Sequence, residues 1–122
     1  MFWQHYVADQ LKDYNVTLYN PRRNDWDSSW EQKIDNPQFN EQVTWELEHL
    51  EQADYIIMYF QPGTYSPISL LELGLFKTKC KVVCPEGFWR KGNVDIVCER
   101  YGISQFNSLD DLIGMFKEAF DI

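Results

Sequence analysis

The chain has little basic charge and no long apolar segment, and each shortage argues against a class of protein. Its 11 Lys and Arg residues face 19 Asp and Glu residues, for a formal net charge of −8. Binding to a nucleic acid polymer depends on many contacts between basic side chains and phosphates, so DNA and RNA are poor partners for this chain. No apolar run approaches the ~20 residues that span a bilayer, and the N-terminus, MFWQHYVADQ, has no basic or apolar region of a signal peptide. We therefore expect no membrane contact and a cytoplasmic location.

Cysteine is also scarce. Cys80, Cys84 and Cys98 lie in apolar or helical stretches. Cys80 and Cys84 span one expected strand, where residues four apart are separated by ~13 Å, which is too far for a disulfide or for two ligands of one metal. We expect buried free thiols, with no metal and no cofactor.

Helical and strand-like segments alternate along the chain, which predicts a single α/β domain over residues 1–122 with a parallel sheet. The run Tyr55–Phe60 is continuously apolar, as in a parallel strand covered on both faces. Asn36-Pro37 and Ser66-Pro67 each pair a capping residue with proline at the first helical position. The order begins with a helix, whereas a doubly wound sheet normally opens with a strand, so we expect the usual first strand to be absent. Helices are expected near residues 2–14, 37–50, 67–76, 94–101 and 109–120, and strands at 16–19, 55–60, 81–84 and 103–106.

Glu72 is the first residue that could carry chemistry. It follows the most apolar strand, and ligands of an open α/β sheet bind outside the carboxyl ends of its strands. The four leucines around it predict a largely desolvated carboxylate, and Gly74 would permit close approach of another backbone. On pattern alone, however, an ordinary surface glutamate on an amphipathic helix is the favoured interpretation.

Glu46 is the second such residue. It lies one turn after Val43, beside the apolar stripe of its helix, from which it could reach the crevice. Here too, pattern alone favours a solvated carboxylate.

The segment Asn20–Trp30 is long and aromatic for a connector, and loops of this length are often functional. Tryptophan rings suit stacking on a base, and carboxylates accept hydrogen bonds from sugar hydroxyls. A flap that covers the core is the alternative. The loop Pro85–Asn93 could form another wall of the site or a contact between subunits.

Four segments together resemble the nucleoside 2-deoxyribosyltransferase-like family: NPRRNDWDSSWEQ, NPQFNEQVTWELEHLEQADYIIMYF, SPISLLELGLF and CPEGFWRKGNVDIVCERYGI. The resemblance covers nearly the whole chain from Trp3. It implies a flavodoxin-like three-layer fold and a glutamate nucleophile in an E-L-G motif, which is Glu72-Leu73-Gly74 here. It also implies a second acidic residue eight positions before Asp54, which is Glu46. The resemblance therefore reverses both interpretations that pattern alone favours.

The activity that the resemblance implies is cleavage or transfer of an N-glycosidic bond through a glycosyl-enzyme ester. Deoxyribosyltransferases of this kind commonly carry an Asp six residues before the nucleophile, and the related nucleotide hydrolases carry a Ser that holds a 5′-phosphate. This chain has Ser66 there, which could also be a plain helix cap, and Thr64 could assist it. We lean to a transferase, with a nucleoside 5′-monophosphate hydrolase or a catalytically silent nucleotide-binding module as alternatives. The expected substrate-binding residues are Asp25, Trp26, Asp27, Asn40, Thr64 and Ser66.

The resemblance also bears on assembly and on completeness. Members are usually dimers or larger, with a neighbour completing the site, so we expect a homodimer or higher oligomer, with Phe88, Trp89 and Arg90 as plausible contacts. Members open with a strand and a small-residue loop that form part of the site, whereas this chain begins inside the first helix. We therefore expect the chain alone to be weakly active or inactive, unless it obtains that strand by another route.

Overall fold

The computed structural model describes residues 3–20 and 29–120. Two compact units make up the chain, one formed by Met1–Leu18 with Asp54–Ile122 and the other by Tyr19–Ala53. The single domain over 1–122 stays a prediction.

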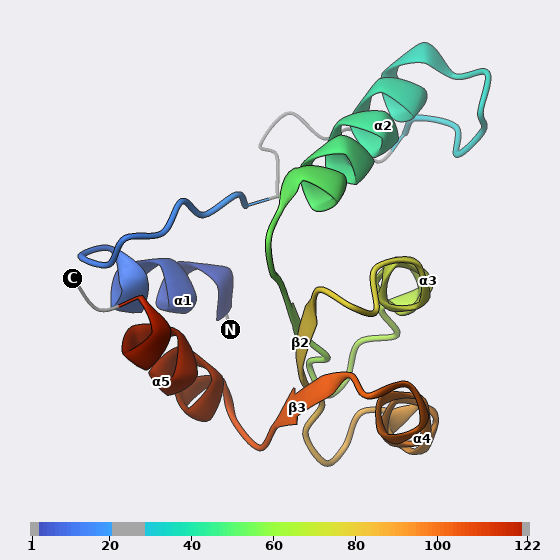
Figure 1. Ribbon diagram of the computed structural model, residues 1–122. Coiled ribbons are helices and arrows are strands. Elements are labelled where there is room, and N and C mark those ends of the chain that lie inside the picture. Colours follow the sequence, from blue (N-terminus) through green and yellow to red (C-terminus); the bar gives the residue numbers. More distant parts are fainter. Residues whose placement is uncertain (1–2, 21–28, 121–122) are drawn as a thin grey trace. The chain divides into compact units, whose positions relative to one another are not determined.

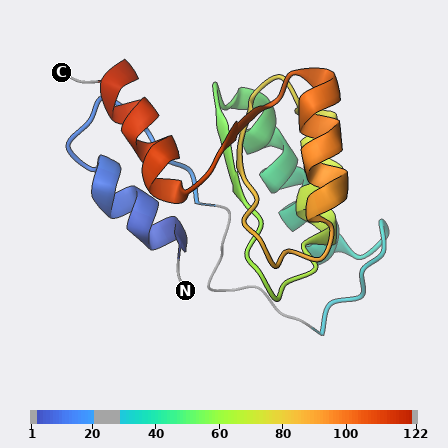
Figure 2. The same cartoon turned by 90° about the horizontal axis from the view of Figure 1, so that it is seen from below.

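The larger unit contains a parallel sheet of three strands, β1 (Ile56–Tyr59), β2 (Cys80–Val83) and β3 (Ser104–Phe106), in the order β1-β2-β3. Ile56 is paired with Cys80, and Lys81 with Ser104. Four helices belong to this unit: α1 (Trp3–Leu11), α3 (Pro67–Leu75), α4 (Lys91–Tyr101) and α5 (Leu109–Ala119). Figures 1 and 2 show α1 and α5 on one side of the sheet and α3 and α4 on the other. The predicted α/β fold with a parallel sheet flanked by helices is confirmed.

Helix α5 shows why this sequence forms the layer that it does. The Ser108 side chain accepts a hydrogen bond from the Asp111 backbone N–H, which satisfies one of the free donors at the helix start. The apolar residues of α5 recur at helical spacing, so one face packs on α1 and on Val83 of β2. The buried core on this side consists of Val7, Leu11, Val83, Leu109, Leu112, Ile113 and Phe116.

The opposite side of the sheet holds the cysteines. Cys80 opens β2, Cys84 follows its end, and Cys98 lies on α4; all three are buried and free. The expectation of buried free thiols is confirmed. Gly102 closes α4 in the left-handed conformation (φ 66°), as expected for a residue just past a helix end.

The smaller unit is built on α2 (Pro37–Gln52). The Asn36 side chain accepts a hydrogen bond from the Phe39 backbone N–H at 3.0 Å, and Pro37 is the first helical residue. The predicted cap is therefore confirmed.

The expected strand at residues 16–19 is wrong. The structure has no strand there, and the segment crosses the boundary between the two units. A β-branched, aromatic run favours an extended chain, but a strand also needs a neighbour with which to hydrogen-bond, and no pattern within the segment supplies one. Among the described residues, no helix has the length and apolar character needed to cross a membrane.

Candidate functional site

Three loops leave the carboxyl edge of the sheet, which is where α/β proteins bind ligands. They follow β1, β2 and β3 and lead into α3, α4 and α5. Because the strands are parallel, all three loops emerge at the same edge. The candidate residues of the larger unit lie on or just after these loops.

Ser66 ends the β1–α3 loop in an unusual conformation. Its φ of 50° is left-handed, and it is the one non-glycine residue with positive φ among those described. Such a conformation costs about 1–3 kcal/mol and tends to occur at functional sites. Ser66 occupies the N-cap position, but its side chain does not cap the helix. Its hydroxyl oxygen instead lies 2.9 Å from that of Thr64. The Thr64 hydroxyl donates a hydrogen bond of 2.8 Å to the Gln61 carbonyl oxygen. The position predicted for Ser66 is confirmed, but capping by its side chain is wrong.

Glu72 lies on α3 and is partly buried. Its surroundings are less apolar than the sequence predicts, because Leu73 is buried while Leu71 and Leu75 are each 61% exposed. The degree of desolvation expected for the Glu72 carboxylate stays a prediction. Burial, followed by the negative charge of Glu72, raises the pKa of the Cys80 thiol to about 11. The carboxylate thus acts electrostatically on the thiol at the start of β2.

Gly74 follows in the same motif. A Cβ added there would meet no atom within 4 Å among the described residues. The close backbone approach expected at this glycine is absent from the described part of the chain.

The smaller unit contains Glu46 and Asn40, both on α2. Glu46 Oε1 accepts a hydrogen bond of 2.8 Å from Gln42 Nε2. Asn40 bonds locally, to the Ile34 carbonyl oxygen at 2.9 Å and to the Thr44 hydroxyl at 3.2 Å.

Gln42 is a residue that the sequence analysis missed. It is 2% exposed, and its Oε1 has no hydrogen-bond partner among the described residues. A buried amide oxygen without a partner is costly and marks a site that needs an explanation. Gln42 lies one helical turn before Glu46, and this spacing could have indicated a contact between the two side chains. The sequence analysis instead followed the apolar residues of the helix, including Val43, and that pattern does not include Gln42. Asp25, Trp26 and Asp27 lie outside the described residues.

The β2–α4 loop contacts the β1–α3 loop. Phe88 is buried, and its ring centroid lies 5.0 Å from that of Phe60. Trp89 donates a hydrogen bond from Nε1 to the Tyr65 carbonyl oxygen at 2.9 Å, and the two rings meet edge to face. Phe88 is therefore a core residue of this unit, whereas Trp89 is half exposed. The subunit contacts expected in this loop stay a prediction.

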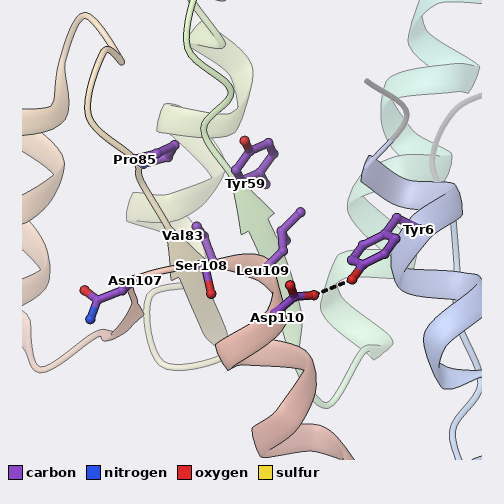
Figure 3. A pocket seen from close by; sticks show the side chains of 8 residues that line it. All are labelled: Tyr6, Tyr59, Val83, Pro85, Asn107, Ser108, Leu109 and Asp110. Carbon is purple, nitrogen blue, oxygen red and sulfur yellow. Dashed lines mark hydrogen bonds between the residues drawn. The ribbon is translucent and has the colours of Figure 1, made fainter.

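A cavity of about 280 Å³ opens at the carboxyl edge, on the side of α1 and α5 (Figure 3). The Tyr6 hydroxyl donates a hydrogen bond to the Asp110 carboxylate, and this bond raises the pKa of Tyr6. The two residues are 104 positions apart, so no local pattern could pair them. The cavity is lined by Tyr6, Tyr59, Val83, Pro85, Asn107, Ser108, Leu109 and Asp110.

A second cavity, of about 320 Å³, lies where β2 and β3 end and α4 begins. Lys91 Nζ donates to the Cys84 carbonyl oxygen at 2.9 Å and lies 3.0 Å from Asp95 Oδ2. Gln105 Nε2 donates to Asp95 Oδ1 at 3.0 Å. These bonds link the end of β2 and strand β3 to the start of α4. Glu72, Thr64 and Ser66 line neither of these two cavities.

The fold and the loops define an α/β protein in which the candidate residues of the larger unit lie on or just after loops at the carboxyl edge of a parallel sheet. The family model described as nucleoside 2-deoxyribosyltransferase like matches residues 1–88, and the chain belongs to this family. The matched region contains Glu46, Ser66 and Glu72. Comparison with curated proteins found no match.

Proposed function

We propose that this protein cleaves or transfers the N-glycosidic bond of a nucleoside or nucleotide, with Glu72 as the nucleophile. The observation that carries the proposal is the Glu72-Leu73-Gly74 motif on the helix that directly follows β1, within the region that matches the family. A carboxylate after the end of a parallel strand is suitably located to meet a ligand at that edge of the sheet.

The proposed reaction has two displacements. A Glu72 carboxylate oxygen bonds to the anomeric carbon while the bond from that carbon to the base nitrogen breaks, and the electron pair leaves with the base. The base takes a proton from an acidic group, which is the role that the family resemblance gives to Glu46. The transition state resembles an oxocarbenium ion, so a nearby carboxylate also stabilises its positive charge.

The ester intermediate then reacts with an acceptor. Attack by a second base at the anomeric carbon restores the Glu72 carboxylate and completes a transfer. Attack by water releases the free sugar and makes the protein a hydrolase. In either case the acceptor gives a proton to the Glu46 carboxylate, which had given its own proton to the departing nucleobase.

Ser66 favours a second candidate function, hydrolysis of a nucleoside 5′-monophosphate. Its hydroxyl and that of Thr64 form a pair at the start of α3, where backbone N–H groups also favour an anion. The other proposed substrate-binding residues are Asn40, Asp25, Trp26 and Asp27. We further propose that the active species is a homo-oligomer.

The test is incubation with purine and pyrimidine deoxynucleosides and their 5′-monophosphates, with and without an acceptor base, followed by chromatography. Exchange of the base supports the transferase, and release without exchange supports the hydrolase. Binding without either reaction would leave a silent nucleotide-binding module and sink the proposal.

The decisive variant is Glu72→Gln, which retains the shape of the side chain and removes the anionic nucleophile. It should abolish base release and leave the thermal unfolding temperature within a few degrees of the wild type. The matched control is Glu99→Gln on the exposed part of α4, which should retain full activity. Turnover by Glu72→Gln would show that another residue is the nucleophile.

A further inference from the structure

Ser66 needs support from its surroundings, because a serine does not hold a left-handed backbone without it. A left-handed residue other than glycine persists only where neighbouring contacts fix it. The two peptide planes on either side of Ser66 determine its φ and ψ, since each peptide unit is planar.

The plane after Ser66 is held by helix α3. The Ser66 carbonyl oxygen accepts a hydrogen bond of 3.1 Å from the Leu70 backbone N–H, which is the first bond of that helix. Pro67 at the first helical position has its own φ fixed by its ring. This side of Ser66 is therefore set by the helix itself.

The plane before Ser66 is held from another loop. It contains the Tyr65 carbonyl, whose oxygen accepts the 2.9 Å hydrogen bond from Trp89 Nε1. The rings of Tyr65 and Trp89 lie 5.2 Å apart at 87°, so the same pair is also packed edge to face. The direction of this carbonyl fixes the plane of the Tyr65–Ser66 peptide and, with it, one side of the φ of Ser66.

Trp89 is itself held in place. Its neighbour Phe88 is buried against Phe60, and the Arg90 guanidinium carbon lies 4.4 Å from the centroid of the indole ring. Gly87 approaches Pro62 so closely that a Cβ on the glycine would lie 3.3 Å from the proline Cβ. The β2–α4 loop is thus an anchored support for the β1–α3 loop.

We infer that Trp89 is a positioning residue: its Nε1–H holds the Tyr65 carbonyl and so keeps Ser66 left-handed, with its hydroxyl oriented toward the 5′ group of the substrate. The part about substrate rests on the proposed function. The part about the backbone of Ser66 rests on the hydrogen bond alone, so the two parts are tested separately.

The first test is structural and needs no activity. Trp89→Phe retains an aromatic ring and removes the donor, and Tyr65→Phe is the matched control because it retains both the ring and the backbone carbonyl. Backbone NMR chemical shifts report φ at Ser66. A shift of Ser66 out of the positive-φ range in Trp89→Phe, but not in Tyr65→Phe, is expected, and an unchanged positive φ in Trp89→Phe would overturn the inference.

A measurement on the wild-type protein covers the case in which Trp89→Phe fails to fold. The Trp89 indole N–H should exchange with solvent more slowly than that of an exposed indole, because it is bonded to the Tyr65 carbonyl oxygen. Exchange at the rate of a free indole would also overturn the inference.

The second test is kinetic and uses the full chain. Trp89→Phe should lower kcat/KM for a deoxynucleoside 5′-monophosphate roughly 5- to 20-fold, mainly through KM. It should change kcat/KM little for the corresponding 5′-deoxy analogue, or when Ser66 is already Ala. An equal loss on both substrates indicates a merely structural role and counts against the inference. If the wild type releases no base from any substrate, the proposed function fails, and the NMR test still decides the role of Trp89.

Discussion

The hydroxyl oxygens of Thr64 and Ser66 lie 2.9 Å apart in the loop between β1 and α3. The Ser66 side chain turns to this neighbour although it occupies the N-cap position of α3, where serine usually bonds to a helix N–H. The left-handed backbone of Ser66 accompanies this arrangement. Ser66 is therefore both a strained residue and a candidate for substrate contact, and the two properties respond differently to substitution.

We predict that Ser66→Gly is more stable than Ser66→Ala by about 1–2 kcal/mol, because glycine adopts a positive φ without the steric cost that alanine meets. Urea unfolding measures the difference. Both variants lack the hydroxyl, so both should lose activity to a similar extent. A glycine variant no more stable than the alanine variant would mean that Ser66 is not strained in solution.

The three cysteines should resist alkylation in the folded protein. Burial is the largest cause that raises the pKa of Cys80, Cys84 and Cys98 to about 11 each. At pH 8 this lowers the thiolate fraction roughly a hundredfold relative to an ordinary thiol. Mass spectrometry after iodoacetamide treatment should find no labelling in the native state and three labels in urea.

The raised pKa values of the three thiols also make the stability of the protein depend on pH. Folding favours the neutral thiols, so their contribution to stability is complete below about pH 9 and is lost as the pH rises through about 11. The free energy of unfolding should therefore fall across this range. Glu72→Gln should lower the pKa of Cys80 and leave that of Cys98 unchanged, since the charge of Glu72 acts on Cys80. Equal effects on both thiols would contradict the placement of Glu72.

Asp95 should stabilise the junction of β2, β3 and α4. The hydrogen bond from Gln105 is the largest cause that lowers the pKa of Asp95, followed by the bond from Lys91. A lowered pKa contributes stability above about pH 4, and this contribution disappears as the pH falls through the folded-state value. Because the Asp95 side chain is 42% exposed, Asp95→Asn should cost only about 0.5–1 kcal/mol at pH 7 and less at pH 3.

The control for Asp95 is Asp9→Asn, which breaks an ion pair with Lys12 at 3.5 Å in which both side chains are about two-thirds exposed. Solvent screens such a pair, so the variant should change stability by less than about 0.3 kcal/mol. Equal losses in the two variants would show that the network around Asp95 has no special role. Denaturant titrations at pH 7 and pH 3 make the comparison.

Gly74→Ala should stabilise the protein by roughly 0.5–1 kcal/mol. Gly74 lies within α3, where alanine has the higher helix propensity, and a Cβ there has open space among the described residues. Thermal or urea unfolding measures the gain, and the exposed helical Gly114→Ala provides a matched comparison. A gain at Gly114 together with a loss at Gly74 would show that another atom approaches Gly74 in solution.

The sequence predicted those elements whose signals are local. The helix cap at Asn36 depends on a few neighbouring residues, and it is present in the structure. The apolar run before Phe60 predicted a buried parallel strand, and β1 is that strand. The Glu72-Leu73-Gly74 motif is also local, and it could be recognised from the sequence alone.

The sequence by itself thus determined the order of helices and strands after residue 36, the parallel sheet and the family, because periodicity, caps and motifs are written within short segments. Only the tertiary structure decided that residues 16–19 form no strand, that Ser66 is left-handed, and that Trp89 supports the loop before it. Each of these features depends on a contact with a residue distant in the sequence, or on the lack of such a contact. Hydrogen bonds between loops, such as that from Trp89 to Tyr65, arise when the sheet brings the ends of β1 and β2 to one edge, and no local pattern contains that information.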